Sequence, residues 1–359
     1  MSTRVVIAGG GTGGHFFPGL AVAQELRRRG AAEVLFVGSD DGIEARAAER
    51  HGFRFVAVRM RAFRGGGMAG VLRSMLALPP AIVAGGRALA SFRPAVVVGL
   101  GSYGSVPVGL AAWLRRTPLV LMEQNVVPGF ANRLLGRFAR RVCTTFTESS
   151  AYFPGGRTVA TGNPVRTLTT SVRPEADAFT LFAFGGSQGA RSINRALVAA
   201  APELQRRLPR LRILHQTGAA DYDEVEAAYR AAGLDVEVTA FIDDMATAYG
   251  RADLVVSRAG ASTLAELAAL AKPAILIPYP VAADDHQRKN ADVVVRAGAA
   301  EMILDRDLDG PVLAEAVAAL AAAPARRAAM GEAMHGFDVP DAAARVIAVC
   351  REATGGEWE

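Results

Sequence analysis

The chain has 359 residues, of which 51% are hydrophobic and 21% are charged, a composition that excludes wholesale disorder and is large enough for two domains. The N-terminal sequence MSTRVVIAGGG lacks the charged and apolar regions of a signal peptide, and the best candidate membrane span, residues 73–87, is interrupted by Pro-Pro at 79–80. The two cysteines, Cys143 and Cys350, are too few for a disulfide framework or a zinc site and fit a reducing compartment.

The positive charge is concentrated in the first half of the chain. Residues 1–160 hold 20 Lys and Arg against 8 Asp and Glu, a net of +12, whereas residues 161–359 hold 20 against 27, a net of −7. Between Glu49 and Glu123 there is no carboxylate, and the arginines there alternate with apolar side chains. A solvated basic face is one interpretation. An anionic membrane surface is favoured over nucleic acid, because no nucleic-acid motif or aromatic stacking platform is present.

Short aliphatic runs alternate with helical patterns along the chain, which is typical of βαβ units and mostly parallel sheets. Two domains are expected to divide near residues 159–166, with Gly162, Asn163 and Pro164 as the linker. Residues 339–355 are expected to form a capped amphipathic helix. Twelve strands are expected, at residues 4–8, 33–37, 54–58, 95–99, 118–122, 141–145, 179–184, 211–215, 235–239, 253–256, 274–277 and 300–303.

The second half of the chain repeats the pattern of the first. Three segments have counterparts in the same order: TRVVIAGGGTGGH with FTLFAFGGSQGAR, AVVVGLGSYGS with DLVVSRAGAST, and PLVLMEQN with PAILIPYP. The repeat predicts two doubly wound α/β domains with a cleft between them, and ligands bound at the carboxyl ends of the strands.

Glycine-rich loops follow four of the expected strands, at residues 9–14, 101–105, 185–189 and 258–263. Tight turns use glycine in any case, but four such loops in two pairs favour a phosphate-bearing ligand at helix N-termini. The first loop also matches the dinucleotide-binding pattern GxGxxG, with Asp40 and Asp41 where a ribose-binding acid would lie. No separate catalytic domain follows, however, and His15 directly after the glycines has no role in dinucleotide binding.

The segment SRAGASTLAEL, residues 257–267, carries a more specific pattern. Ser262 and Thr263 are expected to meet a phosphate at a helix start, and Glu266 lies one turn further along. A carboxylate there can accept both hydroxyls of a ribose; simple capping of the helix is the other interpretation of Glu266.

Several motifs resemble the MurG family of peptidoglycan glycosyltransferases, in the family's order over almost the whole chain. They are GGTGGHFFPGLAVA (10–23), GSYGSVPVGLAAW (101–113), EQNVVPGFAN (123–132), TGNPVR (161–166), GGSQGARSIN (185–194), FIDDMATAY (241–249), SRAGASTLAEL (257–267) and DDHQRKNA (284–291). The resemblance implies a GT-B fold of two Rossmann-like domains. Residues 1–162, with a helix at about 338–355 packing back on them, would bind the lipid acceptor, and residues 163–337 would bind UDP-N-acetylglucosamine.

The resemblance also implies roles for individual residues. Glu266 would bind the ribose, the backbone of Ile242 the uracil, and Ser187 and Arg166 the diphosphate or sugar. Gln287 and Asn125 would contact the N-acetylglucosamine. The remaining implied contacts are the acceptor-side loop Thr12, Gly13 and Gly14, and the ribose and α-phosphate segment Ala261, Ser262, Thr263, Leu264, Ala265 and Glu266.

The implied reaction moves N-acetylglucosamine from UDP-N-acetylglucosamine to the C4 hydroxyl of the N-acetylmuramyl unit of lipid I, with inversion, to give lipid II. A general base with a pKa near neutral is needed, and His15 and Glu123 are the two candidates. No metal or other cofactor is expected, because the adjacent pairs Asp243-Asp244 and Asp284-Asp285 do not form a convincing DxD motif.

The expected partners are UDP-N-acetylglucosamine, undecaprenyl-linked lipid I, an anionic membrane surface and other cell-wall synthesis proteins, at the cytoplasmic face of the membrane. The residues expected to dock at the membrane are Trp113, Leu72, Met75, Leu76 and Ile82. Two alternatives remain open from the sequence: another GT-B enzyme, either an epimerase or a soluble-acceptor transferase, and a non-catalytic nucleotide-sugar sensor.

Overall fold

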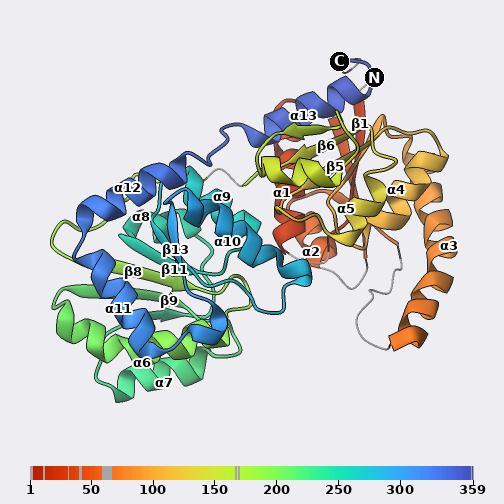
Figure 1. Ribbon diagram of the computed structural model, residues 1–359. Helices are drawn as coiled ribbons and strands as arrows, with labels where there is room; N and C mark the ends of the chain where they lie inside the picture. The colour runs from red at the N-terminus through yellow and green to blue at the C-terminus, as the bar shows by residue number, and fades with distance from the viewer. Residues whose placement is uncertain are drawn as a thin grey trace. The chain divides into compact units, whose positions relative to one another are not determined.

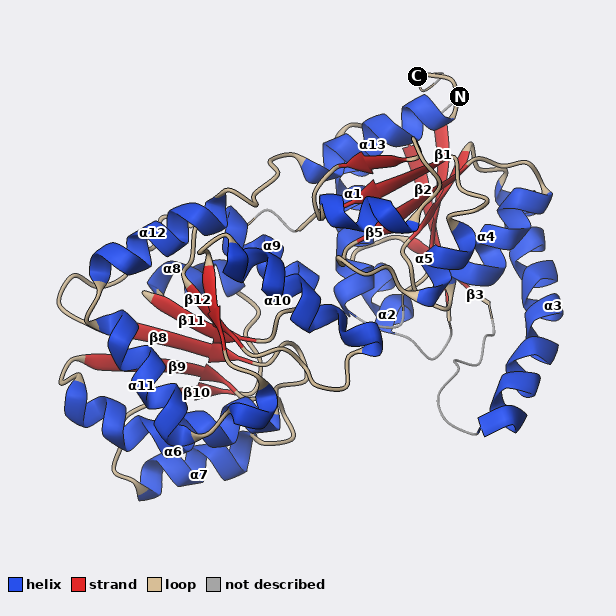
Figure 2. Cartoon of the chain, viewed as in Figure 1, coloured by secondary structure: helices blue, strands red, loops and turns tan. Residues whose placement is uncertain are grey.

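The computed structural model divides into two compact units, which we call unit 1 (Met1–Arg166 and Val339–Glu359) and unit 2 (Thr167–Asp338). Each unit is a parallel sheet with helices packed on its faces (Figures 1 and 2). The structure describes residues 3–10, 13–30, 32–39, 43–58, 67–165, 168, 170–356 and 358, and it leaves out the side chains of residues 43–44 and 67–75.

Unit 1 contains a seven-stranded sheet in the order β3-β2-β1-β4-β5-β6-β7, in which all pairs are parallel. Its strands are β1 (Thr3–Ala8), β2 (Ala32–Gly38), β3 (Arg54–Ala57), β4 (Val96–Gly99), β5 (Leu119–Glu123), β6 (Arg141–Thr144) and β7 (Thr158–Ala160). Its helices are α1 (Gly13–Arg28), α2 (Ile43–Arg50), α3 (Gly67–Phe92), α4 (Ser105–Leu114), α5 (Phe130–Leu135), the 3-10 helix η1 (Thr147–Tyr152) and α13 (Ala342–Ala353).

Alternate residues of the central strands build two separate cores, as the period of a strand requires. Val5 and Ile7 of β1 pack with α1 and α13, whereas Val6 and Ala8 pack in the core that includes residues of α3 and α4. The C-terminal helix α13 lies beside β6 in Figure 1. The guanidinium of Arg140 donates to the carbonyl of Ala353, the last residue of that helix, at a distance of 2.5 Å.

Unit 2 contains a six-stranded parallel sheet in the order β10-β9-β8-β11-β12-β13. Its strands are β8 (Phe179–Phe184), β9 (Leu211–Gln216), β10 (Glu237–Thr239), β11 (Leu254–Ser257), β12 (Ala274–Leu276) and β13 (Ala300–Met302). Its helices are α6 (Arg191–Arg207), α7 (Tyr222–Ala231), α8 (Met245–Arg251), α9 (Ala261–Ala269), α10 (His286–Arg296), α11 (Gly310–Ala321) and α12 (Pro324–His335), with 3-10 turns η2 (Ala283–Asp285) and η3 (Asp305–Asp307).

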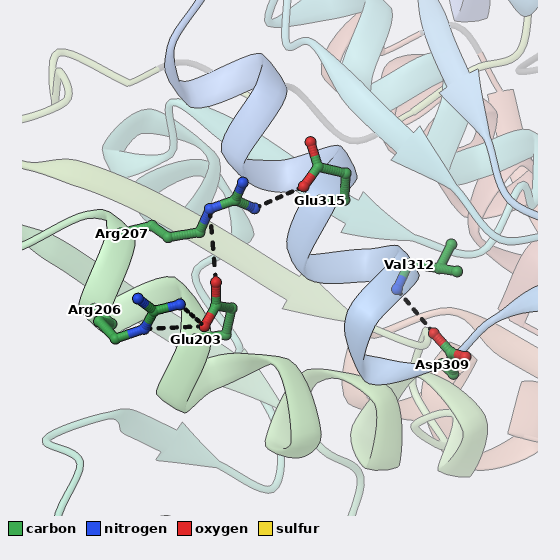
Figure 3. A network of polar contacts seen from close by, with 6 residues as sticks. All are labelled: Glu203, Arg206, Arg207, Asp309, Val312 and Glu315. Carbon is green, nitrogen blue, oxygen red and sulfur yellow. Dashed lines mark hydrogen bonds and ion pairs between the residues drawn. The ribbon is translucent and has the colours of Figure 1, made fainter.

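Helices α6 and α11 pack against each other in unit 2, and the ion pair between Arg207 and Glu315 joins them at their surface (Figure 3). Arg207 of α6 reaches Glu315 of α11 at 2.8 Å, and Glu203 pairs with Arg206 within α6. The carboxylate of Asp309 accepts from the Val312 amide and caps α11. Water screens exposed pairs of this kind, so the buried apolar contacts of α6 and α11 dominate the packing.

All twelve expected strands are present, and the described residues contain one more strand that was not expected. This strand, β7, has three residues at the edge of the sheet, too short a pattern to detect from the sequence. The apolar run at residues 73–87 belongs to the 26-residue helix α3, which continues through Pro79 and Pro80. Among the described residues, no helix is long and apolar enough to cross a membrane.

Candidate active site

The loops that follow β1, β4 and β5 come together at the carboxyl edge of the sheet in unit 1. These three strands are neighbours, so their loops are brought to one edge. The Gly10 amide donates to the Ser102 hydroxyl at 2.8 Å and joins the first two loops. Gly9, which has a φ of +110°, passes so close to the second loop that an added Cβ would lie 2.8 Å from the same hydroxyl.

His15 lies in the first turn of α1, directly after this joined pair of loops, and is half-buried. Gly13 and Gly14 form the same first turn, which contains no acidic residue, so the partial positive charge of the helix N-terminus is not offset within that turn. Thr12, expected to act beside them, lies outside the described residues.

Glu123, the other candidate base, is buried at the end of β5 with 3% of its surface exposed. Its Oε1 accepts from the backbone amide of Asn125 at 2.9 Å, and its Oε2 accepts from the side-chain amide of Asn132 at 2.8 Å. Burial raises the pKa of this carboxyl to about 7, against the lowering effect of the amide donors. Both carboxyl oxygens are therefore engaged in holding the loop between β5 and α5.

In unit 2, the loop after β8 packs directly against the loop after β9. Gly189, at φ +75°, approaches the Thr217 carbonyl so closely that an added Cβ would lie 1.8 Å from the oxygen, which excludes any side chain. The side-chain amide of Gln216 donates to the Gly186 carbonyl at 3.0 Å. Ser187 lies at the exposed tip of this loop, before the first turn of α6.

Arg258 is a buried arginine that sequence reasoning missed, at the end of β11. Its guanidinium donates to the carbonyls of Ile277 and Pro278 at 3.1 and 3.2 Å. It also reaches Asp305 at 2.5 Å and the Ser192 hydroxyl at 2.9 Å. One side chain thus joins the loops after β11 and β12 to the start of α6; an arginine directly after a buried strand was the available signal.

Glu266 lies in the second turn of α9, half-buried, on the helix that begins at Ala261 after Gly260. Its Oε2 accepts a hydrogen bond from the Tyr249 hydroxyl at 2.9 Å. Ser262, Thr263 and Ala265 are also partly exposed, whereas the side chains of Ala261 and Leu264 are buried. Any contact of those two residues with a ligand would therefore be made by their backbone.

The remaining donor-side residues lie at two further loops of unit 2. Ile242 is half-buried in the segment between β10 and α8, just before Asp244, whose carboxylate accepts from the Thr247 amide and caps α8. Gln287 lies in the first turn of α10, and its Oε1 accepts from the Tyr279 amide at 3.0 Å. Arg166 lies outside the described residues.

The structure thus places the described candidates at the sheet edges of their own units. Tyr249 was missed together with Arg258, because its partner Glu266 lies on a different helix, 17 residues further along the chain. In the part of the chain that the structure describes, no group of three or more His, Cys, Asp or Glu side chains is arranged to hold a metal ion.

Two family models match successive parts of the chain. The glycosyltransferase family 28 N-terminal domain matches residues 5–144, and the glycosyltransferase family 28 C-terminal domain matches residues 180–346. With the two parallel-sheet units, these matches define a glycosyltransferase of the GT-B fold, as expected from the sequence.

Proteins of similar sequence identify the family of glycosyltransferases more closely. UDP-N-acetylglucosamine--N-acetylmuramyl-(pentapeptide) pyrophosphoryl-undecaprenol N-acetylglucosamine transferase from Anaeromyxobacter sp. (strain K) is 45% identical over 360 residues, which cover 99% of this chain and 94% of the relative. The transferase of the same name from Geobacter sulfurreducens is 44% identical, with coverages of 96% and 97%. The chain belongs to the MurG family.

Solved structures agree with this assignment. The crystal structure of Acinetobacter baumannii MurG superposes with a TM-score of 0.80 at 30% identity and covers 98% of this chain and 99% of its own. UDP-GlcNAc 2-epimerase from Neisseria meningitidis, solved bound to UDP-GlcNAc, gives a TM-score of 0.70 at 12% identity, a likeness that shows the fold alone.

A buried histidine near the end of β9 provides a test of the core of unit 2. His215 of β9 is fully buried between the Tyr229 hydroxyl, 2.9 Å from Nδ1, and the Asn194 side-chain oxygen, 3.1 Å from Nε2. Because a charged imidazole would lose its hydration there, burial lowers the pKa of His215 to about 3. The folded unit therefore favours the neutral imidazole of His215 over the charged form.

We predict that unit 2 is destabilised by mild acid through His215. Since the folded pKa lies below the ordinary value near 6.5, the contribution to stability is complete above pH 6.5 and decreases as the pH falls toward the folded value. At pH 5 the free energy of unfolding should be lower by about 2 kcal/mol than at pH 8. Hydrogen exchange of β8 and β9, corrected for intrinsic rates, measures this loss. A His215→Gln variant should show little of it; equal losses in both proteins would contradict the prediction.

Proposed function

We infer that this chain transfers N-acetylglucosamine from UDP-N-acetylglucosamine to the N-acetylmuramyl unit of lipid I, and so makes lipid II for peptidoglycan. The observation that carries this conclusion is the 45% identity to a transferase of that name over 99% of the chain. A transfer assay with a lipid I analogue tests it. The expected product contains one added N-acetylglucosamine and appears with free UDP. Conversion of the nucleotide sugar to its 2-epimer would instead indicate an epimerase, the enzyme named for a distant fold relative.

Unit 2 is proposed to bind the donor. Glu266 accepts the ribose hydroxyls, and the N-terminus of α9 takes the phosphate next to that ribose. The backbone of Ile242 reads the uracil, and Gln287 contacts the N-acetylglucosamine. Ser187 contacts the diphosphate or the sugar, as does Arg166, the last residue of the first segment of unit 1. The partial exposure of Glu266 and the exposed position of Ser187 support these roles.

Unit 1 is proposed to bind the acceptor and to supply the base. The loop at Thr12, Gly13 and Gly14 takes part in this site, next to His15 at the start of α1. The side chain of Asn125, also in unit 1, contacts the N-acetylglucosamine. The net positive charge of unit 1 suits an acceptor that carries a diphosphate.

The reaction is proposed to be a single displacement with inversion. The acceptor O4 forms a bond to the anomeric carbon as the bond from that carbon to the UDP oxygen breaks, and the O4 proton passes to His15. Charge that develops on UDP is stabilised by Arg166 and by the N-terminus of α9. Glu123 has both oxygens bound to amides and is buried, so it is proposed to position the Asn125 loop rather than to take the proton.

We predict that His15→Ala lowers kcat by about 100-fold or more, because a positioned base contributes on that scale. The dissociation constant of UDP should stay within about twofold, since the nucleotide is bound by unit 2. Steady-state turnover assays and calorimetry measure the two quantities. Glu123→Gln is the comparison variant: if it removes the acidic limb of the pH–rate profile while His15→Ala keeps it, Glu123 is the base and the assignment is wrong.

For the donor site, Glu266→Ala should raise the KM for UDP-N-acetylglucosamine by about tenfold or more, because two hydrogen bonds to a charged acceptor are lost. The value of kcat at saturating donor should change much less. Steady-state kinetics with varied donor measure both. An unchanged KM would remove the ribose role of Glu266.

Unit 1 is also proposed to dock, as a peripheral protein, on the cytoplasmic face of an anionic membrane. Helices α3 and α4 pack together and expose Leu76 and Val83 on the first and Trp113 and Leu114 on the second. The exposed residues Arg87, Arg115 and Arg116 lie on or next to these helices. Ile82, expected in this patch, instead packs against the core, and the side chains of Leu72 and Met75 lie outside the described residues.

We predict that the protein sediments with vesicles containing phosphatidylglycerol and much less with phosphatidylcholine vesicles, and that salt weakens the binding. Leu76→Ser combined with Trp113→Ser should reduce binding several-fold, whereas Val312→Ser, at an exposed site on α11 of unit 2, should not. Equal binding to both kinds of vesicle, regardless of salt, would rule out the electrostatic contribution.

A further inference from the structure

Tyr249 is a fully buried tyrosine whose hydroxyl contacts the carboxylate proposed to read the ribose. Its ring meets Phe182 and Phe184 of β8 edge to face, with centroids 5.5 and 5.9 Å apart. The hydroxyl donates to Oε2 of Glu266 at 2.9 Å. The ring is therefore fixed by packing, and its one polar atom is directed at Glu266.

This contact restricts the carboxylate of Glu266 before any ligand arrives. A glutamate side chain loses considerable rotamer freedom when it is ordered, and a ligand that must order it binds more weakly for that reason. A donor held rigidly at one carboxyl oxygen removes much of this cost. The same tyrosine belongs to α8, which begins just after Ile242, so one short helix connects the proposed uracil and ribose contacts.

We propose that Tyr249 is a positioning residue that sets the specificity of the donor site for a nucleotide with a free ribose 2′,3′-diol. It acts by holding Glu266 in the conformation that accepts both hydroxyls. The inference rests on the proposed role of Glu266 and adds to it the group that makes that role selective.

The test compares the binding of UDP and of 2′,3′-dideoxy-UDP by calorimetry, because only the first offers the diol. Tyr249→Phe removes a single hydroxyl and keeps the packed ring. Tyr229→Phe is the matched control, since Tyr229 is also buried in unit 2 and its hydroxyl contacts His215 instead. Glu266→Ala tests the proposed ribose contact itself.

The wild-type protein should prefer UDP over the dideoxy nucleotide by about tenfold or more. Tyr249→Phe should weaken UDP binding roughly fivefold and leave dideoxy-UDP within about twofold, so that the preference shrinks. It should also raise the KM for the donor while kcat stays nearly constant. Tyr229→Phe should keep the full preference.

The outcomes separate the inference from the proposed function. If Tyr249→Phe weakens both nucleotides equally, or weakens neither, the hydroxyl has no positioning role and the inference is wrong. If Glu266→Ala removes the preference while Tyr249→Phe retains it, the inference alone fails. If Glu266→Ala also retains the preference, Glu266 does not read the ribose and the proposed donor contact fails as well.

Discussion

Parallel strands bring all of their following loops to one edge of the sheet, and at that edge the loops of this protein pack on one another. In unit 1 the backbone at Gly9, with a φ of +110°, lies so close to the next loop that an added Cβ would be 2.8 Å from the Ser102 hydroxyl. In unit 2 the backbone at Gly189 lies against the Thr217 carbonyl with no room for a side chain. Glycine is needed in both places because the neighbouring loop, and not only a ligand, occupies the space beside the backbone.

Behind these loops, buried polar side chains fix the groups that face outward. Glu123 accepts amide hydrogens from the segment that carries Asn125, and the burial that raises its pKa to about 7 is tolerated because those donors are present. Arg258 binds three neighbouring segments of unit 2, and Tyr249 holds Glu266. The buried polar side chains at each sheet edge therefore hold the neighbouring loops and site residues in position.

The sequence predicted the strands and the class of fold because both depend on local, repeated patterns. Twelve strands followed from aliphatic runs, while β7 was missed because three residues at an edge carry almost no periodicity. The position of Glu266 one turn after Ser262 was predictable because both residues lie on a single helix. The contacts that hold these carboxylates could not be predicted in the same way. Tyr249 meets Glu266 only through the packing of α8, β8 and α9. The burial of Glu123 depends on loops that are far apart in the sequence and meet only in the folded unit. Helix α3 likewise continues through two prolines that suggested a break.

The GxGxxG pattern in the first loop left open which half of the chain binds the nucleotide, and we assign that role to unit 2. A crystal structure of the protein with UDP tests this assignment most directly. We expect ribose hydroxyls within hydrogen-bond distance of the Glu266 carboxylate and a phosphate at the N-terminus of α9. A nucleotide bound instead at the loop of Gly9 and Gly14, with no ribose at the Glu266 carboxylate, would contradict it.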